Sequence, residues 1–151
     1  MCTLDAIDFA ILSELTGNAR KTLKELSSRI NLSAPAVATR IRKLESDSTI
    51  VGYHAVLDYE KLGYEITAVV HVALPPERRD AFRAVIREKP RVISCDQMTG
   101  DYSIMMRAVF RGRRELAEFL GEMEPFGKTR TQIVLASLQE PFGYASFEAS
   151  L

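Results

Sequence analysis

The residue types best suited to binding chemistry lie in one short stretch, NLSAPAVATRIRKLE, residues 31–45. A helix turns about 100° per residue, so this stretch places Val37, Ile41 and Leu44 together on an apolar side. Its other side carries small residues, a hydroxyl and cations. Small side chains let a helix approach base edges closely, a hydroxyl bonds a base, and cations and helix amides bind phosphates. The pattern predicts a nucleic-acid-binding face made of Ser33, Pro35, Ala36, Thr39, Arg40, Arg42 and Lys43.

The charge distribution supports this face more than the total charge does. The chain has 20 basic and 20 acidic residues, and this balance says nothing about a polyanion partner. Residues 20–43, however, hold seven basic residues and one acidic residue, a local charge of +6. A basic region on a neutral chain favours a polyanion at one end of the molecule. For basic clusters in general, a solvated surface is the commoner interpretation.

Three helices are expected to position these residues. Asp5 is a suitable N-cap for a first helix, in which Leu4, Ile7, Ile11 and Leu15 recur at helical spacing and which Gly17-Asn18 ends. A capping box, Thr22 to Glu25, begins a second helix that is expected to bury Leu23, Leu26 and Ile30. Asn31 ends that helix, and Ser33 caps the third, with Pro35 in its first turn. Two helices joined by about three residues form a helix-turn-helix.

The second half of the chain alternates strands and helices. Apolar alternation predicts strands at 66–74, 91–99, 102–110 and 129–138, and helical spacing predicts helices at 77–89 and 114–123. This β-α-β-β-α-β order matches the ferredoxin-like arrangement. We therefore expect an α+β chain: a three-helix, winged helix-turn-helix domain at 1–50, a β-ribbon and linker at 51–65, a ferredoxin-like sensing and oligomerisation domain at 66–138, and a tail at 139–151.

Few residues suit catalysis or metal binding. His54 and His71 have no metal or triad spacing, and Cys95 fits a small core residue in a strand better than a nucleophile. Cys2 and Cys95 give no disulfide framework, the first ten residues lack a signal-peptide pattern, and the longest apolar run is too short to span a bilayer. We expect a cytoplasmic protein that is not an enzyme and has neither cofactor nor metal.

The residues also resemble a known family. The segments LDAIDFAILSEL, NARKTLKELSSRINLSAPAVATRIRKLE and IVGYHAVLD are similar to the N-terminal half of Lrp/AsnC regulators, and VISCDQMTGDYSIMMRAV and GKTRTQIVLASL are similar to their ligand-sensing domain. The resemblance implies a transcription factor on double-stranded DNA, a dimer that assembles further into a ring of four dimers, and an amino acid or similar small effector.

The resemblance also implies an effector site. It places one wall at Thr99, Gly100, Asp101, Tyr102 and Ser103, and the other at Gly127, Thr129 and Thr131. Two positions depart from the family pattern: Ser48 stands where the family usually has glycine, and Ser103 where it typically has aspartate. Because that aspartate would face an α-ammonium group, we expect weak amino-acid binding, or Asp101 in its role, or a different ligand.

Two further predictions concern assembly and function. The second face of the expected sheet is apolar, with Val69, Ala73, Met105 and Val109, and this favours a dimer through residues 66–138. The alternative functions are an effector-independent DNA-packaging protein and, with less support, a metabolic enzyme on a ferredoxin-like domain.

Overall fold

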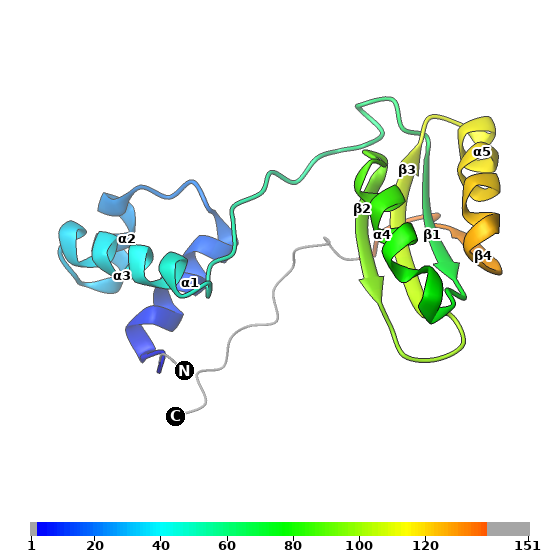
Figure 1. The fold of residues 1–151 in the computed structure, drawn as a ribbon. Coiled ribbons are helices and arrows are strands. Elements are labelled where there is room, and N and C mark those ends of the chain that lie inside the picture. Colours follow the sequence, from blue (N-terminus) through cyan, green and yellow to red (C-terminus); the bar gives the residue numbers. More distant parts are fainter. Residues whose placement is uncertain (1–2, 139–151) are drawn as a thin grey trace. The chain divides into compact units, whose positions relative to one another are not determined.

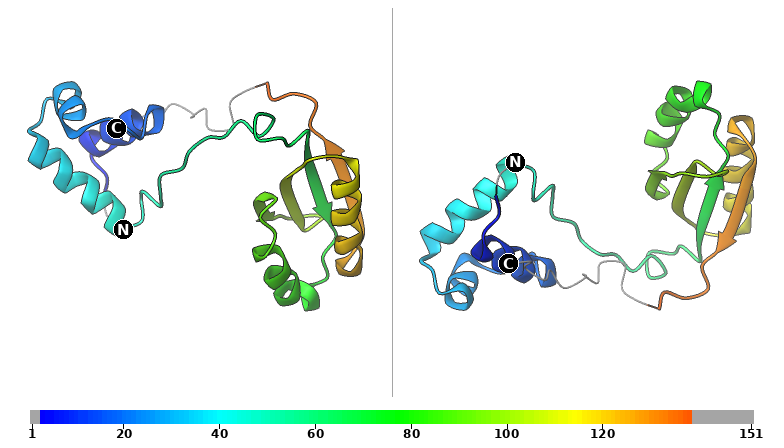
Figure 2. Two further views of the ribbon diagram at one scale, coloured as in Figure 1. Left: turned by 90° about the horizontal axis from the view of Figure 1, so that it is seen from above. Right: turned by 90° about the horizontal axis from the view of Figure 1, so that it is seen from below.

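The computed structural model describes residues 3–138, which form two compact units that meet in the sequence between Val56 and Leu57 (Figure 1). The expected tail, 139–151, lies outside the described residues. The first unit contains α1 (Ala6–Gly17), α2 (Leu23–Ile30) and α3 (Ala34–Ser46), grouped together in both views of Figure 2.

The local signals that begin and end these helices are confirmed. Asp5 and Thr22 each form a capping box, and the Ser33 side chain accepts from the amide of Ala36. Asn31 ends α2 in the left-handed conformation, with φ 59°. Ser48, after α3, has φ 61°, so this serine adopts the conformation that favours glycine.

A small apolar core holds the three helices. It consists of Ile11, Leu15, Leu26, Val37 and Leu44, and Ile41 packs against it. The expectation that Leu23 is buried is wrong: it is the first residue of α2 and stays 42% exposed. The end of a helix projects beyond its neighbours, so the helical spacing alone does not decide burial there.

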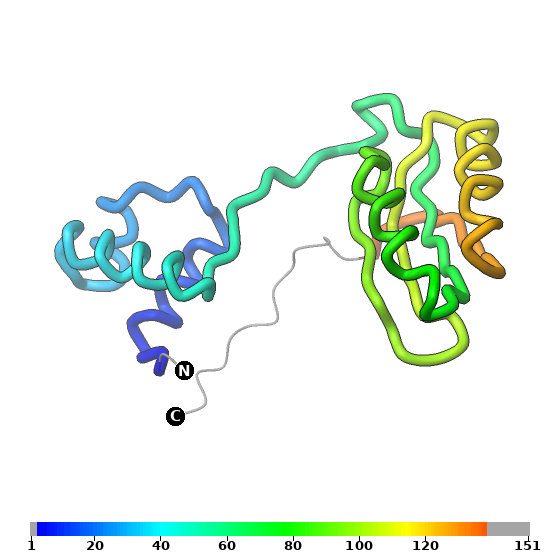
Figure 3. The backbone as a smooth tube through the Cα atoms, viewed as in Figure 1, coloured from blue at the N-terminus to red at the C-terminus, as the bar shows by residue number. Residues whose placement is uncertain are grey.

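The expected β-ribbon is absent from the segment 51–65, which is described throughout and has neither helix nor strand (Figure 3). A strand needs a neighbour for its backbone hydrogen bonds, and this segment has none within the described chain. Its apolar side chains are exposed, Val51 by 88%, with Tyr53, Val56 and Leu57 also exposed.

The second unit is a four-stranded antiparallel sheet with two helices. Its elements are β1 (Ile66–Val72), the 3-10 turn η1 (Pro76–Arg78), α4 (Arg79–Arg87), β2 (Val92–Gln97), β3 (Ile104–Phe110), α5 (Arg113–Met123), the 3-10 turn η2 (Glu124–Phe126) and β4 (Thr129–Ile133). The strand order is β2-β3-β1-β4, and in Figure 1 α4 lies nearer β2 and α5 nearer β4. This is the predicted ferredoxin-like topology, with a last strand shorter than expected.

One face of the sheet carries the core of this unit. Alternate residues of β1 and β3, among them Val70, Met106 and Phe110, pack with Phe82 of α4 and Phe119 of α5. The opposite face carries Val69, His71 and Met105, all partly exposed. Val109 was expected to be exposed there but is only 2% exposed, so the open apolar face is smaller than the alternation predicts.

Candidate nucleic-acid interface and effector loop

Helix α3 presents the predicted polar face to solvent. Ser33, Pro35, Thr39, Arg42 and Lys43 are exposed, and Ala36 is half-buried. Pro35, Thr39 and Arg42 are separated by four and three positions, and this spacing places them on one face of the helix. Val37 and Leu44 on the other side are fully buried, and this fixes the rotation of the helix.

Short hydrogen bonds order the polar groups of this face. The Thr39 hydroxyl donates to the Pro35 carbonyl over 3.0 Å and accepts from Arg42 Nη2 over 3.3 Å. Arg42 Nε donates to the Ala38 carbonyl over 3.3 Å. The Arg42 guanidinium is thereby held beside Thr39 at the surface, where its remaining donors are available to a ligand.

Arg40 has a different environment. Its Nη1 lies 2.7 Å from Asp5 Oδ2 and 2.8 Å from Asp8 Oδ1, both at the start of α1, and Asp8 is only 3% exposed. The amide of Asp8 and then the Arg40 guanidinium hold the pKa of Asp5 below its ordinary value of 3.8. Arg40 thus joins α3 to α1, and its charge is already compensated within the unit.

The other basic residues of the +6 region are also partly compensated. Glu14 of α1 pairs with Lys21 and lies 3.6 Å from Arg29, and the hydrogen bond from Lys21 is the main cause of its lowered pKa. The charge of +6 was counted over residues 20–43 alone. It overestimated the local charge because Asp5, Asp8 and Glu14, which pair with basic residues of this region, lie before residue 20. Within the described residues, Arg20, Lys24 and Arg42 make no ion pair, and they are exposed.

The predicted effector loop, residues 99–103, joins β2 to β3. Gly100 has φ 102°, a backbone conformation that favours glycine. Tyr102 packs edge-on against His71 of β1, with ring centroids 6.1 Å apart. The Ser103 hydroxyl donates to the Leu74 carbonyl over 3.1 Å and accepts from the Leu74 amide over 3.2 Å. Ser103 therefore ties the loop to the chain just after β1.

The second predicted wall meets the same end of β1 from the other side. The Ala73 amide donates to the Lys128 carbonyl over 2.9 Å. Gly127 has φ 154°, and a Cβ atom there would lie 2.2 Å from the Ala73 carbonyl oxygen. Only glycine permits this close approach.

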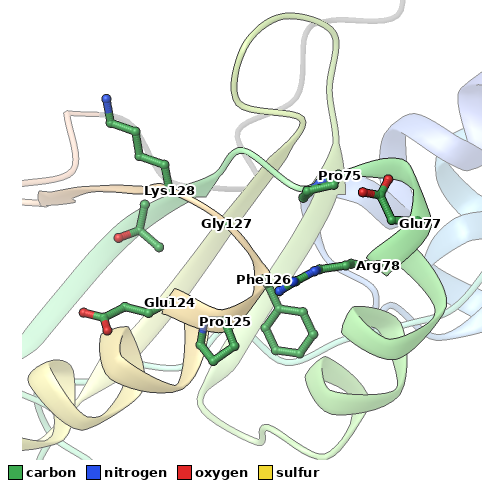
Figure 4. Close-up of a pocket in the computed structure, with 9 residues that line it drawn as sticks. Pro75, Glu77, Arg78, Glu124, Pro125, Phe126, Gly127 and Lys128 are labelled. Carbon is green, nitrogen blue, oxygen red and sulfur yellow. The ribbon is translucent and has the colours of Figure 1, made fainter.

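A shallow depression of about 490 Å³ lies beside Gly127 and Thr129 (Figure 4). Figure 4 shows Arg78 extending toward Phe126, and prolines border the depression. Glu77 and Glu124 supply negative charge to its lining, and Arg78 and Lys128 supply positive charge. Residues 99–103 and Thr131 do not line it, so the structure brings the two predicted walls to one end of β1 without joining them in one cavity of the described chain.

The sequence did not identify Asp5, Asp8, Glu77 or Arg78 as site residues. Asp5 was recognised as a cap, but no sequence signal links it to a residue 35 positions later. Glu77 and Arg78 enter the depression because η1 folds back toward η2, a tertiary arrangement that local spacing does not encode.

The described part of the chain has no helix long and apolar enough to cross a membrane. It also contains no group of three or more His, Cys, Asp or Glu side chains that could hold a metal ion.

Comparison with known proteins follows the same division of the chain. Residues 4–51 match the winged helix-turn-helix DNA-binding family, and residues 67–142 match the Lrp/AsnC ligand binding domain. The uncharacterized HTH-type transcriptional regulator YezC of Bacillus subtilis is 35% identical over 134 residues, which cover 89% of this chain and 95% of that one. The Bkd operon transcriptional regulator of Pseudomonas aeruginosa is 36% identical over 123 residues, 80% of each chain.

Solved structures agree with these matches. Bacillus subtilis LrpC has a TM-score of 0.85 at 27% identity, over 91% of this chain and 98% of LrpC. A Neisseria meningitidis transcriptional regulator in complex with L-methionine has a TM-score of 0.85 at 28% identity, over 91% of this chain and 94% of its own. This chain therefore belongs to the Lrp/AsnC family, and it is a helix-turn-helix transcriptional regulator that binds DNA rather than an enzyme.

Proposed function

We propose that the exposed face of α3 reads the major groove of operator DNA. Thr39 contacts a base edge, Pro35 and Ala36 allow close approach, and Ser33, Arg42 and Lys43 bind phosphates. The observation that carries this assignment is the Thr39–Arg42 pair, which is exposed and ordered on a helix whose opposite side is buried. Arg40 supports the helix from behind and makes no base or phosphate contact.

The test is a footprint and an affinity titration on the DNA that flanks the protein's own gene. Thr39→Ala should reduce the preference for operator over unrelated DNA, because a base contact distinguishes sequences. Full retention of that preference in Thr39→Ala would remove Thr39 from the reading face.

The effector, in this proposal, is an amino acid that binds in the depression beside Gly127. An amino acid carries an ammonium group and a carboxylate. In the depression, Glu77 and Glu124 can bind the ammonium group, and Arg78 and Lys128 can bind the carboxylate. Because Ser103 is bonded to the Leu74 backbone, the glutamates take the place of the aspartate that Ser103 replaces. The L-methionine complexes of relatives from Neisseria meningitidis and Mycobacterium tuberculosis support an amino-acid ligand.

Calorimetry with the twenty amino acids tests this site. The best ligand should bind Arg78→Gln at least tenfold more weakly than wild type, since a charge-assisted hydrogen bond contributes about 1.5–3 kcal/mol and about 1.4 kcal/mol corresponds to tenfold. Arg113→Gln, which removes an exposed arginine of α5 outside the depression, is the control. Binding that is equal in both variants would place the ligand elsewhere.

A dimer, assembled further into a ring, is the proposed active form. The exposed apolar residues of the segment 51–57 and the partly exposed Val69 and Met105 need covering, and a second copy of the chain supplies matching surfaces. An effector-independent DNA-packaging role is the second candidate, and the observation that favours it is the engagement of Ser103 with the backbone. A footprint that no amino acid alters would favour that role.

A further inference from the structure

A second cavity lies between α4 and β2, next to the depression beside Gly127 but lined by other residues: Phe82 of its lining packs against Phe126 of the depression, with ring centroids 5.3 Å apart. We call it the α4–β2 cleft; it measures about 240 Å³, and its lining is Leu74, Arg79, Phe82, Arg83, Ile86, Arg87, Cys95, Gln97 and Ile104. None of its residues is shared with the depression. It is smaller than pockets for drug-sized ligands, so any occupant is a small molecule.

The cleft exists because β2 is an edge strand that α4 does not fully cover. Cys95 and Gln97 pair with Met106 and Ile104 of β3, whose side chains are buried beneath the helices. Cross-strand partners point to the same face, so Cys95 and Gln97 also face the helix side, yet both are exposed. The gap above them is open to solvent at the edge and apolar within, where Phe82, Ile86 and Ile104 form its floor.

The helical wall of the cleft is strongly basic. Arg79, Arg83 and Arg87 recur every four residues, all are exposed, and none makes an ion pair within the described residues. Like charges at this spacing repel each other, so the row is destabilising unless an anion lies beside it. No acidic residue lines the cleft.

We propose that the α4–β2 cleft binds a small monocarboxylate with an aliphatic or aromatic tail and no ammonium group. The guanidinium groups bind the carboxylate through charge-assisted hydrogen bonds, and the tail packs on Phe82, Ile86 and Ile104. An amino acid is disfavoured because its ammonium would meet arginine and find no carboxylate. The regulator therefore carries a second ligand site, with a ligand class different from that of the depression beside Gly127.

Cys95 provides a reporter inside the cleft. The chain has two cysteines, so in a Cys2→Ser variant of the full chain iodoacetamide alkylates Cys95 alone, and intact mass gives the rate. The probe pair is 4-methylpentanoate and L-leucine, which share a carbon skeleton and differ by the amino group. We expect 4-methylpentanoate to slow the alkylation in a saturable way and leucine not to.

Charge variants locate the binding. In the Cys2→Ser background, Arg83→Gln should raise the concentration of 4-methylpentanoate needed for half protection about tenfold. Arg113→Gln, on α5, should leave it unchanged, and thermal melting checks that both variants fold. Inorganic phosphate and an unrelated DNA duplex serve as further probes, and neither should protect Cys95 as 4-methylpentanoate does.

Four results would overturn the proposal. The first is no protection at 10 mM 4-methylpentanoate, a concentration about 10,000-fold above the Kd of a micromolar site. The second is equal protection by leucine. The third is equal protection by inorganic phosphate, which would indicate a general anion surface, and the fourth is protection by the duplex, which would assign the arginine row to DNA. None of these four results would contradict the proposed amino-acid site beside Gly127, because that site is tested separately by calorimetry on Arg78→Gln.

Discussion

Arg40 and Arg42 lie two positions apart on α3, and the structure places them in different environments. Arg42 is exposed beside Thr39, whereas Arg40 is bonded to Asp5 and Asp8. We expect Arg42→Ala to reduce affinity for all DNA sequences and to lower the slope of log affinity against log salt by about one, the value for one phosphate contact. Arg40→Ala should instead lower the melting temperature by several degrees, because it leaves Asp8 buried without its partner.

Fluorescence anisotropy at several salt concentrations, together with thermal melting, separates the two effects. An Arg40→Ala variant that melts like wild type but loses a phosphate contact would return Arg40 to the DNA-binding face. The sequence alone could not make this distinction, because the helical wheel places Arg40 at the flank and the acids that turn it inward are 32 and 35 residues earlier.

Asp5 adds a dependence on pH. Its pKa is lowered in the folded chain, chiefly by the amide of Asp8 and then by Arg40. A lowered carboxyl pKa stabilises the folded state above the unfolded value of 3.8, and this stabilisation is lost as the pH falls through the lower folded pKa. Asp5→Asn should therefore lower the melting temperature at pH 7, and this difference from wild type should shrink below about pH 3. A difference that stays constant from pH 7 to pH 2 would rule out this linkage.

Ser48, which stands where the family usually has glycine, has a left-handed backbone conformation. Its φ of 61° is sterically unfavourable for a residue with a Cβ atom, by about 1 kcal/mol. Ser48→Gly should raise the free energy of unfolding by about 1 kcal/mol in urea denaturation. Ser46→Gly is the control, since Ser46 is the last helical residue of α3 and glycine there should destabilise. Equal effects of the two substitutions would show that the left-handed turn stores no strain.

At the scale of elements, the sequence predicted what is local and missed what needs a partner. The caps of α1, α2 and α3 and the alternation of β1 depend on residues within a few positions, and these were predicted. The alternation of β3 was predicted except at Val109, which is buried. The β-ribbon and linker were predicted at 51–65 from apolar residues, and the described chain has no strand there, because a strand requires a neighbouring strand. The depression beside Gly127 was only half predicted, since η1 reaches it through the fold and not through the sequence pattern.

Among the glycines described in the second unit, Gly127, in the turn from η2 into β4, is the one at which an added Cβ atom would meet another atom within 4 Å. A methyl group at this position would lie 2.2 Å from the Ala73 carbonyl oxygen, so Gly127→Ala must displace either β4 or the end of β1. We expect a loss of at least 2 kcal/mol in the free energy of unfolding, typical of a substitution that creates a steric clash and strained φ, and weaker amino-acid binding. Urea denaturation and calorimetry measure the two effects.

Gly121→Ala is the matched control within the same unit. Gly121 lies inside α5, and an added Cβ would meet nothing within 4 Å. Alanine there should stabilise the chain by about 1 kcal/mol through its higher helix propensity. A Gly127→Ala variant as stable as Gly121→Ala would show that the close approach to Ala73 is not required.

At the scale of the whole molecule, the exposed apolar surface predicts assembly. Val69 lies on the open face of the sheet, opposite Arg107 in register, while the neighbouring Ala68 and Val70 are buried on the helix face. A charge at Val69 should therefore disturb the open face and spare the core. We expect Val69→Asp to be monomeric at micromolar concentration, because the new carboxylate, even beside Arg107, would lose its hydration in the dimer interface.

The monomer should then bind an operator with two half-sites about 100-fold more weakly, since a dimer engages its second half-site at high effective concentration. Light scattering gives the mass, anisotropy gives the affinity, and circular dichroism checks the fold. Ala117→Asp, on the exposed side of α5, adds the same charge elsewhere and should change neither mass nor affinity.

If Val69→Asp keeps the mass of wild type, the open face of the sheet is not the dimer interface. The exposed apolar residues of the segment 51–57 would then be the surface to test, with Val56→Asp as the corresponding substitution, since Val56 is also exposed in the single chain.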